Sequence, residues 1–469
     1  MKYLHEFRDP VHNFITATSD ERLVIDSRPV QRLRHINQLA LSSFVYPGAT
    51  HRRFEHSLGV MHLAGEAFDV LTRQENVKDD VRELIPELNA VQNFPYWRNV
   101  VRMAALCHDL GHLPFSHAAE HETLPEGVSH ETLSERILLS DGMAHIFGQM
   151  IPLISPSMVA KLAVGPEKSA EPFGVWEAML TDLITGNAFG VDRIDYLLRD
   201  SHHAGVAYGR FDHLRLVQTL RLLVPVQGPN DVDERAAPTI GVEIGGLNSA
   251  EALLLARYFM FGQVYFHPVR VAYDIHLVDF LKAWLPDGKF ATDVDEHLAM
   301  TDNEVWVGIR EVSTKPDHPA YDPARRVLER DHYKVLYTRS ASDLAVWGEP
   351  GKAVHDWAAA EYGPDNVRHR KPQKSGGVID FPVLESAGTV ASSLAISETL
   401  RNLPPNAADL VFIRPDLRED ASRKLKRGTL LREILEEASA REVQAEDADA
   451  SSAEVIDHDE RMRGEVREE

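Results

Sequence analysis

The sequence predicts a mainly α-helical fold with a smaller α+β lobe towards the carboxyl end and an acidic, flexible tail. From about residue 28 to residue 285, apolar residues recur at three- and four-residue spacing, the period of helices that bury one face. After residue 286, short runs of β-favouring residues alternate with helical stretches. From Glu436 onward the chain has 13 acidic and 4 basic residues and no aromatic residue, which favours a solvated tail.

The helical period is clearest in five stretches. These stretches are "VQRLRHINQLAL" (30–41), "SLGVMHLAGEAFDVL" (57–71), "VVRMAALCHDL" (100–110), "FDHLRLVQTLRLLV" (211–224) and "SAEALLLARYFMFGQVYF" (249–266). Proline and glycine mark loops at 46–49 and 228–238 and a domain boundary at 286–288. We therefore predict a helical core over residues 1–285, an α+β lobe over 286–435 that is regulatory or oligomerising, and an acidic tail over 436–469.

The α+β lobe contains three runs typical of strands and a short helical run before the tail. The strand runs are "HYKVLYTR" (332–339), "GGVIDFPVL" (376–384) and "ADLVFIRP" (408–415), and the helical run is "TLLREILEEA" (429–438). Positive charge gathers in "VRHRKPQK" (367–374) and "RKLKR" (423–427), which we interpret as solvated surface. The pattern does not identify the function of this lobe, and a protein partner for it is left open.

Composition narrows the class of protein. With 50 Lys and Arg against 72 Asp and Glu, the net charge of −22 opposes general binding to nucleic acid or anionic membranes. A single cysteine, Cys107, permits no internal disulfide and fits a reducing compartment. No apolar run approaches the roughly 20 residues of a membrane helix. We expect a soluble, cytoplasmic protein with no membrane partner.

The stretch "RMAALCHDLGHLPFSHAAE" (102–120) concentrates residues that ligate metals. Its pattern predicts a helix with His108 and His112 one turn apart, until Pro114 disturbs it. Imidazole and carboxylate together suit Mn, Fe, Zn or Mg. Hydrogen-bonded core histidines are the alternative for this stretch alone, and His56 upstream and Asp192 downstream weaken that alternative because they complete four ligands.

The order His56, His108-Asp109, Asp192 resembles the HD phosphohydrolase superfamily. Three stretches narrow the resemblance to the HD-domain deoxynucleoside triphosphate (dNTP) triphosphohydrolases: "QRLRHINQLALSSFVYPGATHRRFEHSLGVMHLAG" (31–65), "HDLGHLPFSHAAE" (108–120) and "VDRIDYLLRDSHHAG" (191–205). The likeness covers residues 1 to about 285. It implies one divalent metal, Mn, Fe, Mg, Co or Zn, held by those four side chains.

The resemblance also implies roles for other residues. In the family, a histidine and a carboxylate matching His117 and Glu120 transfer the proton, and His112 and His130 match further active-site histidines. A triphosphate needs local cations in an acidic protein, and Arg53, Arg193 and Arg257 match the phosphate contacts. The positions that match the sugar pocket are Gln38, Tyr196, Asp200 and Tyr265. An aromatic ring under the sugar selects deoxynucleotides by leaving a 2′-hydroxyl without space.

A second nucleotide site is implied only in part. Asp26, Gln31 and Arg34 match guanine-nucleotide contacts of the vertebrate relatives, and Arg215 matches a neighbouring phosphate contact. Three positions depart from that pattern, since His5 and Pro268 stand where lysines are expected and "GVEIGG" (241–246) lacks a basic pair. The resemblance implies a homo-oligomer, dimer or tetramer, with different activator chemistry.

The function expected from these residues is metal-dependent hydrolysis of dNTPs to deoxynucleoside and tripolyphosphate, for pool balance or against phage. Another HD phosphohydrolase activity, on monophosphates, alarmones or cyclic dinucleotides, is an alternative, although "HDLGH" lacks the lysine typical of cyclic-diguanylate enzymes. A non-catalytic nucleotide sensor is a second alternative. A nucleic-acid binder ranks last, because only two short basic clusters offer a groove.

Overall fold

The computed structural model describes residues 4–169, 171–225, 236–372, 379–404, 407–426 and 429–440. The chain forms two compact units, Met1–Arg330 with Ser375–Asn406, and Asp331–Lys374 with Ala407–Glu469. The division differs from the boundary predicted near residue 286. Val305 and Ile309 share a buried cluster with Tyr273 and Leu277, so burial of apolar surface ties the residues after 286 to the first unit. The predicted acidic tail lies outside the described residues from 441 onward.

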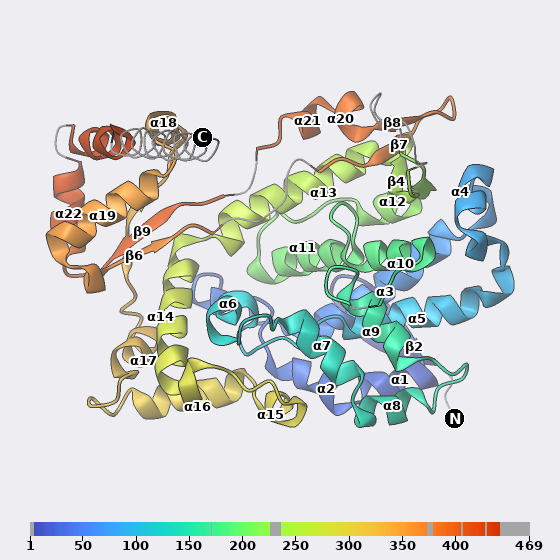
Figure 1. Cartoon of the computed structure of the whole chain (residues 1–469), viewed down its shortest axis with the longest axis horizontal. Helices are drawn as coiled ribbons and strands as arrows, with labels where there is room; N and C mark the ends of the chain where they lie inside the picture. Colours follow the sequence, from blue (N-terminus) through green and yellow to red (C-terminus); the bar gives the residue numbers. More distant parts are fainter. Residues whose placement is uncertain are drawn as a thin grey trace, which may run out of the picture. The chain divides into compact units, whose positions relative to one another are not determined.

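The first unit is built mainly from helices (Figure 1). They are α1 (Ser19–Ile25), α2 (Arg28–Arg32), α3 (Arg53–Leu71), α4 (Asp79–Leu84), α5 (Phe94–Cys107), α6 (Glu120–Thr123), α7 (His130–Leu138), α8 (Asp141–Phe147), α9 (Pro156–Val164), α10 (Val175–Thr185), α11 (Val191–Ala204), α12 (His213–Gln218), α13 (Leu247–Met260), α14 (Pro268–Trp284), α15 (Val294–Ala299), α16 (Asp302–Val312), α17 (Tyr321–Leu328), α20 (Ser393–Ile396) and α21 (Glu398–Arg401). The fold class predicted from the helical period is confirmed.

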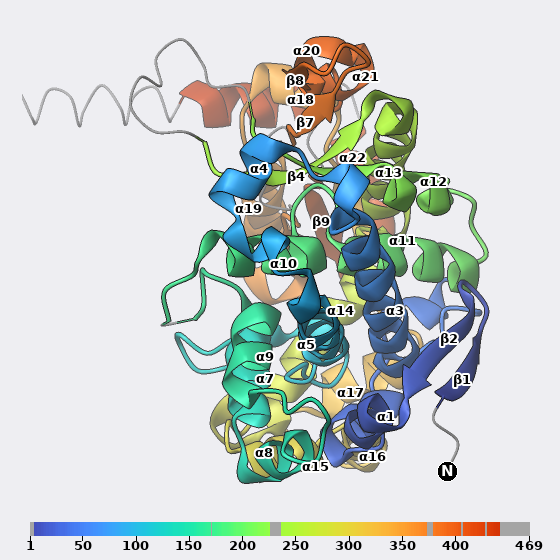
Figure 2. The ribbon, with the colours of Figure 1, turned by 90° about the vertical axis from the view of Figure 1, so that its right-hand side faces the viewer.

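Helix α3 lies at the centre of this unit and packs against both α5 and α11 (Figure 2). Most of its residues are buried, so its sequence is apolar on nearly every side. Gly59 permits the close approach of α11, because a Cβ there would lie 1.9 Å from Oδ1 of Asp195. A second buried cluster joins α14, α16 and α17 to residues 113–124. The loop after α5 is therefore packed against the later helices.

Two small sheets belong to the first unit. Strands β1 (Leu4–Asp9) and β2 (Asn13–Thr18) form an antiparallel hairpin. The other sheet has the order β3 (Leu220–Leu223), β4 (Thr239–Glu243), β7 (Pro382–Leu384), β8 (Val390–Ser392), with β4 and β7 parallel. The helix predicted over 211–224 is thus wrong in its last residues. Helix α12 ends at Gln218, and the following leucines pair with β4 instead.

The second unit contains an antiparallel sheet of β5 (Lys334–Thr338), β9 (Leu410–Ile413) and β6 (Val367–Arg370), in that order. Its helices are α18 (Ala341–Val346), α19 (Pro350–Tyr362) and α22 (Arg418–Leu425), and residues 430–440 are also helical. The predicted strands at 332–339 and 408–415 are confirmed, while 376–384 supplies β7 of the first unit. Among the described residues, no helix combines the length and apolarity needed to cross a membrane.

Candidate active site

Three helices bring the predicted metal ligands together. His56 lies in the first turn of α3, His108 directly follows α5, and Asp192 is the second residue of α11. The helix predicted to run on to Pro114 is wrong, because α5 ends at Cys107 and residues 108–111 form turns. Helix α7 packs closely against the turn that follows α5: a Cβ at Gly111 would lie 2.1 Å from the carbonyl oxygen of His130.

The four side chains converge at bonding range. Nε2 of His56 lies 3.0 Å from Oδ1 of Asp192 and 3.7 Å from Oδ2 of Asp109. Nε2 of His108 lies 3.2 Å from Oδ1 of Asp109 and 3.5 Å from Oδ1 of Asp192. His56, His108 and Asp109 are buried, and their ligand atoms all lie within 4.8 Å of one another. These three side chains could hold one ion, and Asp192 lies beside them through its contacts with both histidines.

The outward-facing ring nitrogens support this assignment. Nδ1 of His56 pairs with Oδ2 of Asp195 at 2.8 Å, and Nδ1 of His108 with the carbonyl of Ala105 at 2.8 Å. Metal-binding histidines usually donate their second nitrogen to such a partner, which leaves the other nitrogen free for the ion. Nε2 of His108 is buried and has no hydrogen-bond partner. The residues present therefore fit a divalent metal with nitrogen and oxygen ligands.

Protons compete for this site. Burial lowers the pKa of His56, but hydrogen bonds with Asp192 and Asp195 raise it to about 10. Burial likewise opposes protonation of His108, yet Asp109 and Asp192 raise its pKa. The pKa values of Asp109 and Asp192 are lowered despite burial, chiefly by His108. The carboxylates of the site therefore favour the protonated forms of both imidazoles, which compete with a metal for the same nitrogens.

We predict that metal binding releases protons near neutral pH, because a ligating imidazole must be neutral. Calorimetry with Mn²⁺ in buffers of different ionisation enthalpy should find at least about one proton released at pH 7.5. Affinity should rise with pH until about pH 10, the pKa of His56. The stabilisation that protonated His56 gives the metal-free fold is present below pH 6.5 and lost as pH rises through about 10. A pH-independent affinity would contradict the assignment.

A buried charge network that the sequence did not reveal lies behind His56. Asp195 accepts a bidentate pair from Arg199 at 2.8 and 2.9 Å and pairs with Nε2 of His12 at 2.6 Å. Arg199 also donates to Asp9 at the end of β1. The spacing of Asp192 and Asp195, three residues apart on α11, was the available signal, because it places both carboxylates on one side of a helix.

The residues predicted to transfer a proton also form one group. Glu120 lies 3.1 Å from Nδ1 of His117 and 2.6 Å from Nδ1 of His130. His130 stacks on His112 with ring centroids 4.1 Å apart, and His112 lies 3.2 Å from Asp109. His112 thus connects this group to the metal ligands. His117 keeps 61% of its side chain exposed, so it is open to solvent and to a bound molecule.

The pKa values of these neighbouring side chains shift in different directions. Burial opposes ionisation of Glu120, but hydrogen bonds with His117 and His130 hold its pKa far below the usual range. Burial lowers the pKa of His112, and nearby Arg53 adds to this shift. Glu120 raises the pKa of His130 against the effect of burial. Glu120 therefore favours its ionised form, and the neighbouring His130 favours its protonated form.

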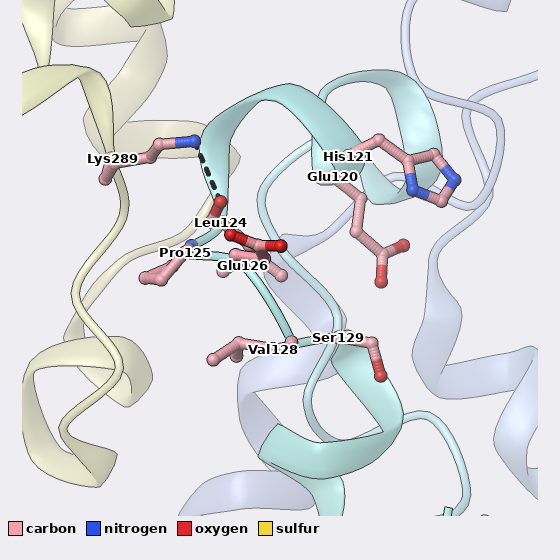
Figure 3. Close-up of a pocket in the computed structure, with 9 residues that line it drawn as sticks. Glu120, His121, Leu124, Pro125, Glu126, Val128, Ser129 and Lys289 are labelled. Atoms are coloured by element: carbon pink, nitrogen blue, oxygen red, sulfur yellow. Dashed lines mark hydrogen bonds between the residues drawn. The ribbon is translucent and has the colours of Figure 1, made fainter. Parts of the chain in front are cut away.

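A pocket of about 310 Å³ opens beside this group (Figure 3). Glu120 and Ser129 lie on one side of it, and Lys289 lies on the other with its ammonium bonded to the carbonyl of Leu124 at 2.8 Å. Its remaining lining residues are His121, Leu124, Pro125, Glu126, Gly127 and Val128. The pocket gives Glu120 a route to solvent.

Of the three predicted phosphate contacts, one lies at the centre and the other two lie close to each other. Arg53 is buried, donates to Asp109 and to Oγ of Ser116, and so lies beside the metal ligands. Arg193 and Arg257 both donate to the carbonyl of Asn187, so they lie close together. Nε of Arg193 is buried without a partner. Burial and Arg193 lower the pKa of Arg257 to about 10.

The predicted sugar contacts continue along α11. Asp192, Tyr196 and Asp200 are spaced by four residues and share one face. Asp200 accepts from the hydroxyl of Tyr265 at 2.8 Å and pairs with His51 at 2.7 Å, and the two tyrosine rings lie edge to face. Three buried polar atoms of these residues have no hydrogen-bond partner: the hydroxyl of Tyr196, Oε1 of Gln38 and Nδ1 of His51. Such atoms favour a ligand that completes their hydrogen bonds.

Only some of the residues predicted to bind a second nucleotide contact one another. Arg34 donates to Gln31 at 2.8 Å and lies over the ring of Phe54. Asp26 pairs with Arg22, which also contacts His5. Arg215 instead donates to the carbonyl of Gly245 at 3.2 Å. Pro268 begins α14, where it occupies the first helical turn.

Comparison with known proteins finds two family models that match this chain. A model described as "HD domain" matches residues 53–197, and one described as "HD associated region" matches residues 211–356. The uncharacterised protein YwfO of Bacillus subtilis is 32% identical over 278 residues, 59% of this chain and 54% of YwfO. Human deoxynucleoside triphosphate triphosphohydrolase SAMHD1 is 33% identical over 237 residues, 46% of this chain and 35% of that protein. The chain spans about half the length of the first curated relatives that it matches.

A solved structure extends the likeness to nearly the whole chain. The crystal structure of a hypothetical protein from Aquifex aeolicus superposes with a TM-score of 0.71 at 32% identity. The match covers 90% of this chain and 100% of that protein. The HD-domain match includes His56, His108, Asp109 and Asp192, the four residues that converge in space. The chain therefore contains an HD domain followed by an HD-associated region.

Proposed function

We propose that this protein hydrolyses dNTPs to deoxynucleoside and tripolyphosphate with a divalent metal held by His56, His108, Asp109 and Asp192. When bound, the metal polarises the α-phosphate and lowers the pKa of water. The ion is Mn, Fe, Mg, Co or Zn. The relatives named as dNTP triphosphohydrolases support the substrate class.

The proposal rests on helix α11, which carries one metal ligand and two predicted sugar contacts in order along its length. Asp192 belongs to the metal centre, whereas Tyr196 and Asp200 lie in the group that includes Tyr265 and His51. Four helical residues rise about 6 Å, comparable with the distance between an α-phosphate and the sugar of a nucleotide. A nucleotide lying along α11 would therefore place its phosphate at the metal and its deoxyribose beside Tyr196 and Tyr265.

In the proposed reaction, the remaining predicted site residues bind the triphosphate or transfer the proton. Arg53, Arg193 and Arg257 balance the charge of the triphosphate, which the overall negative charge of the protein disfavours. His117, fixed by Glu120, gives a proton to the leaving 5′-oxygen. His112 and His130 align the phosphate between the metal and this donor.

Regulation by nucleotides is a further part of the proposal. Gln31 and Arg34, which contact each other on the surface, and Asp26 nearby in sequence support an activator site that links subunits into a dimer or tetramer. Lowering of dNTP pools, for balance or against phage, would be the result in the cell.

Product analysis tests the proposal. Purified protein is incubated with each dNTP and NTP, singly and in mixtures that supply activators, together with Mn, Mg, Co or Fe. We expect chromatography to separate deoxynucleoside and tripolyphosphate. Release of pyrophosphate or monophosphate would favour another HD phosphohydrolase activity. Binding of nucleotide without any product would favour a sensor.

A further inference from the structure

The turn that separates the metal ligands from His117 has an unfavourable backbone. Phe115 and Ser116 both adopt positive φ angles, 58° and 59°, although neither is glycine. L-residues rarely adopt this left-handed conformation, so surrounding contacts must hold it. Phe115 is fully buried, and its ring lies edge-on to Trp306 of α16 at 5.7 Å. The position of His117 therefore depends on what fixes this turn.

Asp302, the first residue of α16, supplies the main polar contact to the turn. Its Oδ1 accepts from the backbone N–H of Phe115 at 2.7 Å, and its Oδ2 accepts from the backbone N–H of Asn37 at 2.8 Å. The carbonyl of Asn37 in turn accepts from Oγ of Ser116 at 2.7 Å. One carboxylate, only 1% exposed, thus joins two segments that lie 78 residues apart in sequence.

The local sequence fixes this carboxylate firmly. Thr301 caps α16, and Glu304 returns the bond to the backbone N–H of Thr301 at 2.8 Å, which completes a capping box. Burial raises the pKa of Asp302 to about 6, although the N–H groups of Asn37 and Phe115 favour its ionised form. Near pH 7.5 the carboxylate is ionised, and both oxygens are available as acceptors.

Arg32 connects the residues before this turn to Met300, which lies two residues before Asp302. Its guanidinium donates to the carbonyl of Met300 at 2.9 and 3.1 Å. It also donates to the carbonyls of Leu110 at 3.3 Å and His112 at 3.0 Å. The side chain is 4% exposed. Residues 300–302 are thus connected to both ends of the segment 110–116.

We propose that Asp302 is a positioning residue that, with Arg32, holds the 110–116 segment so that His112 and His117 face the metal centre. Asp302 and Met300 lie in the HD-associated region, whereas the segment they hold lies in the HD domain. The HD-associated region is therefore part of the catalytic unit, because it fixes the geometry of the proton donor. The inference rests on the proposed function only for the choice of substrate.

The variant Asp302→Asn in the full chain tests this role. The amide has one acceptor oxygen, so one of the two backbone N–H groups loses its partner while shape is kept. We expect kcat to fall by about 10- to 100-fold, the effect of displacing a catalytic group by about 1 Å. KM and the Kd for Mn²⁺ should stay near their wild-type values. Hydrogen exchange should accelerate in peptides covering 113–123 and not in those from α3.

The matched control is Asp295→Asn, which neutralises an exposed aspartate of α15 whose side chain is 85% exposed. It should change none of these quantities. Arg32→Lys, which cannot make the forked contacts, provides a second test if Asp302→Asn does not fold, with the same expected split between kcat and metal affinity.

Two results would overturn the proposal: unchanged kcat and unchanged exchange in the folded variants, or a loss of metal affinity in parallel with kcat. Wild-type protein that hydrolyses no dNTP would refute the proposed function. The exchange and metal measurements would still test Asp302, because they need no substrate.

Discussion

Replacing His108 and Asp109 together by alanine should abolish metal binding and turnover at once. Both side chains face the same small volume as His56 and Asp192, so their loss leaves two of four ligands. Two ligands do not retain an ion against water and protons at micromolar metal. We expect metal content measured by atomic emission to fall to background, and hydrolysis to fall by several orders of magnitude.

Thermal unfolding gives a second measurement on the same variant. With free Mn²⁺ at about 100 times Kd, wild-type protein should gain about 2.7 kcal/mol of unfolding free energy. The variant should gain none. The matched control replaces Asp141 and His145, an exposed pair on α8, by alanine and should behave as wild type. Full activity in the His108 and Asp109 variant would show that the metal assignment is wrong.

Glu120→Gln should reduce kcat by about 10²- to 10⁴-fold, the usual contribution of a positioned acid or base. Glutamine keeps the length of the side chain but removes the charge that fixes His117 and raises the pKa of His130. Metal content should be unchanged, because Glu120 is not among the four converging ligands. Steady-state kinetics with metal analysis separates this effect from loss of the ion.

The pH profile makes the test of Glu120 sharper. Since Glu120 raises the pKa of His130, the variant should lose the protonated form of His130 at a lower pH than wild type. Glu126→Gln, on an exposed part of the same loop, is the matched control and should leave kcat and the profile unchanged. An active Glu120→Gln enzyme with a wild-type profile would remove Glu120 from the proton-transfer group.

Sequence reasoning predicted the convergence of His56, His108, Asp109 and Asp192 because their types and order carry the signal. Patterns along the chain also predicted the helical class, since burial of one helix face leaves a visible period. The same patterns placed the end of α5 wrongly, since α5 ends at Cys107. The apolar period continues to Leu110 in the sequence, and the close packing of α7 against Gly111 leaves no trace in that pattern.

The supporting residues were missed for a related reason. Asp302 acts on Phe115 across 187 residues, and no motif around Asp302 distinguishes it from the other aspartates of the chain. His51 and Asp195 complete the environment of Asp200 and His56, yet a buried histidine or aspartate is common in any helical core. The partner of such a side chain becomes visible only when the chain is folded. The division of the chain after residue 330 also depends on packing between α14 and α16. The amino-acid composition does not change at that point.

The central claim is that water activated at the four-ligand centre attacks the α-phosphate of a dNTP. Hydrolysis in water enriched in oxygen-18, followed by mass spectrometry of both products, tests it most directly. Attack at phosphorus breaks the bond between the α-phosphorus and the 5′-oxygen, so the label should appear in tripolyphosphate and not in the deoxynucleoside. Label in the 5′-hydroxyl of the deoxynucleoside, or in a released monophosphate, would contradict the account.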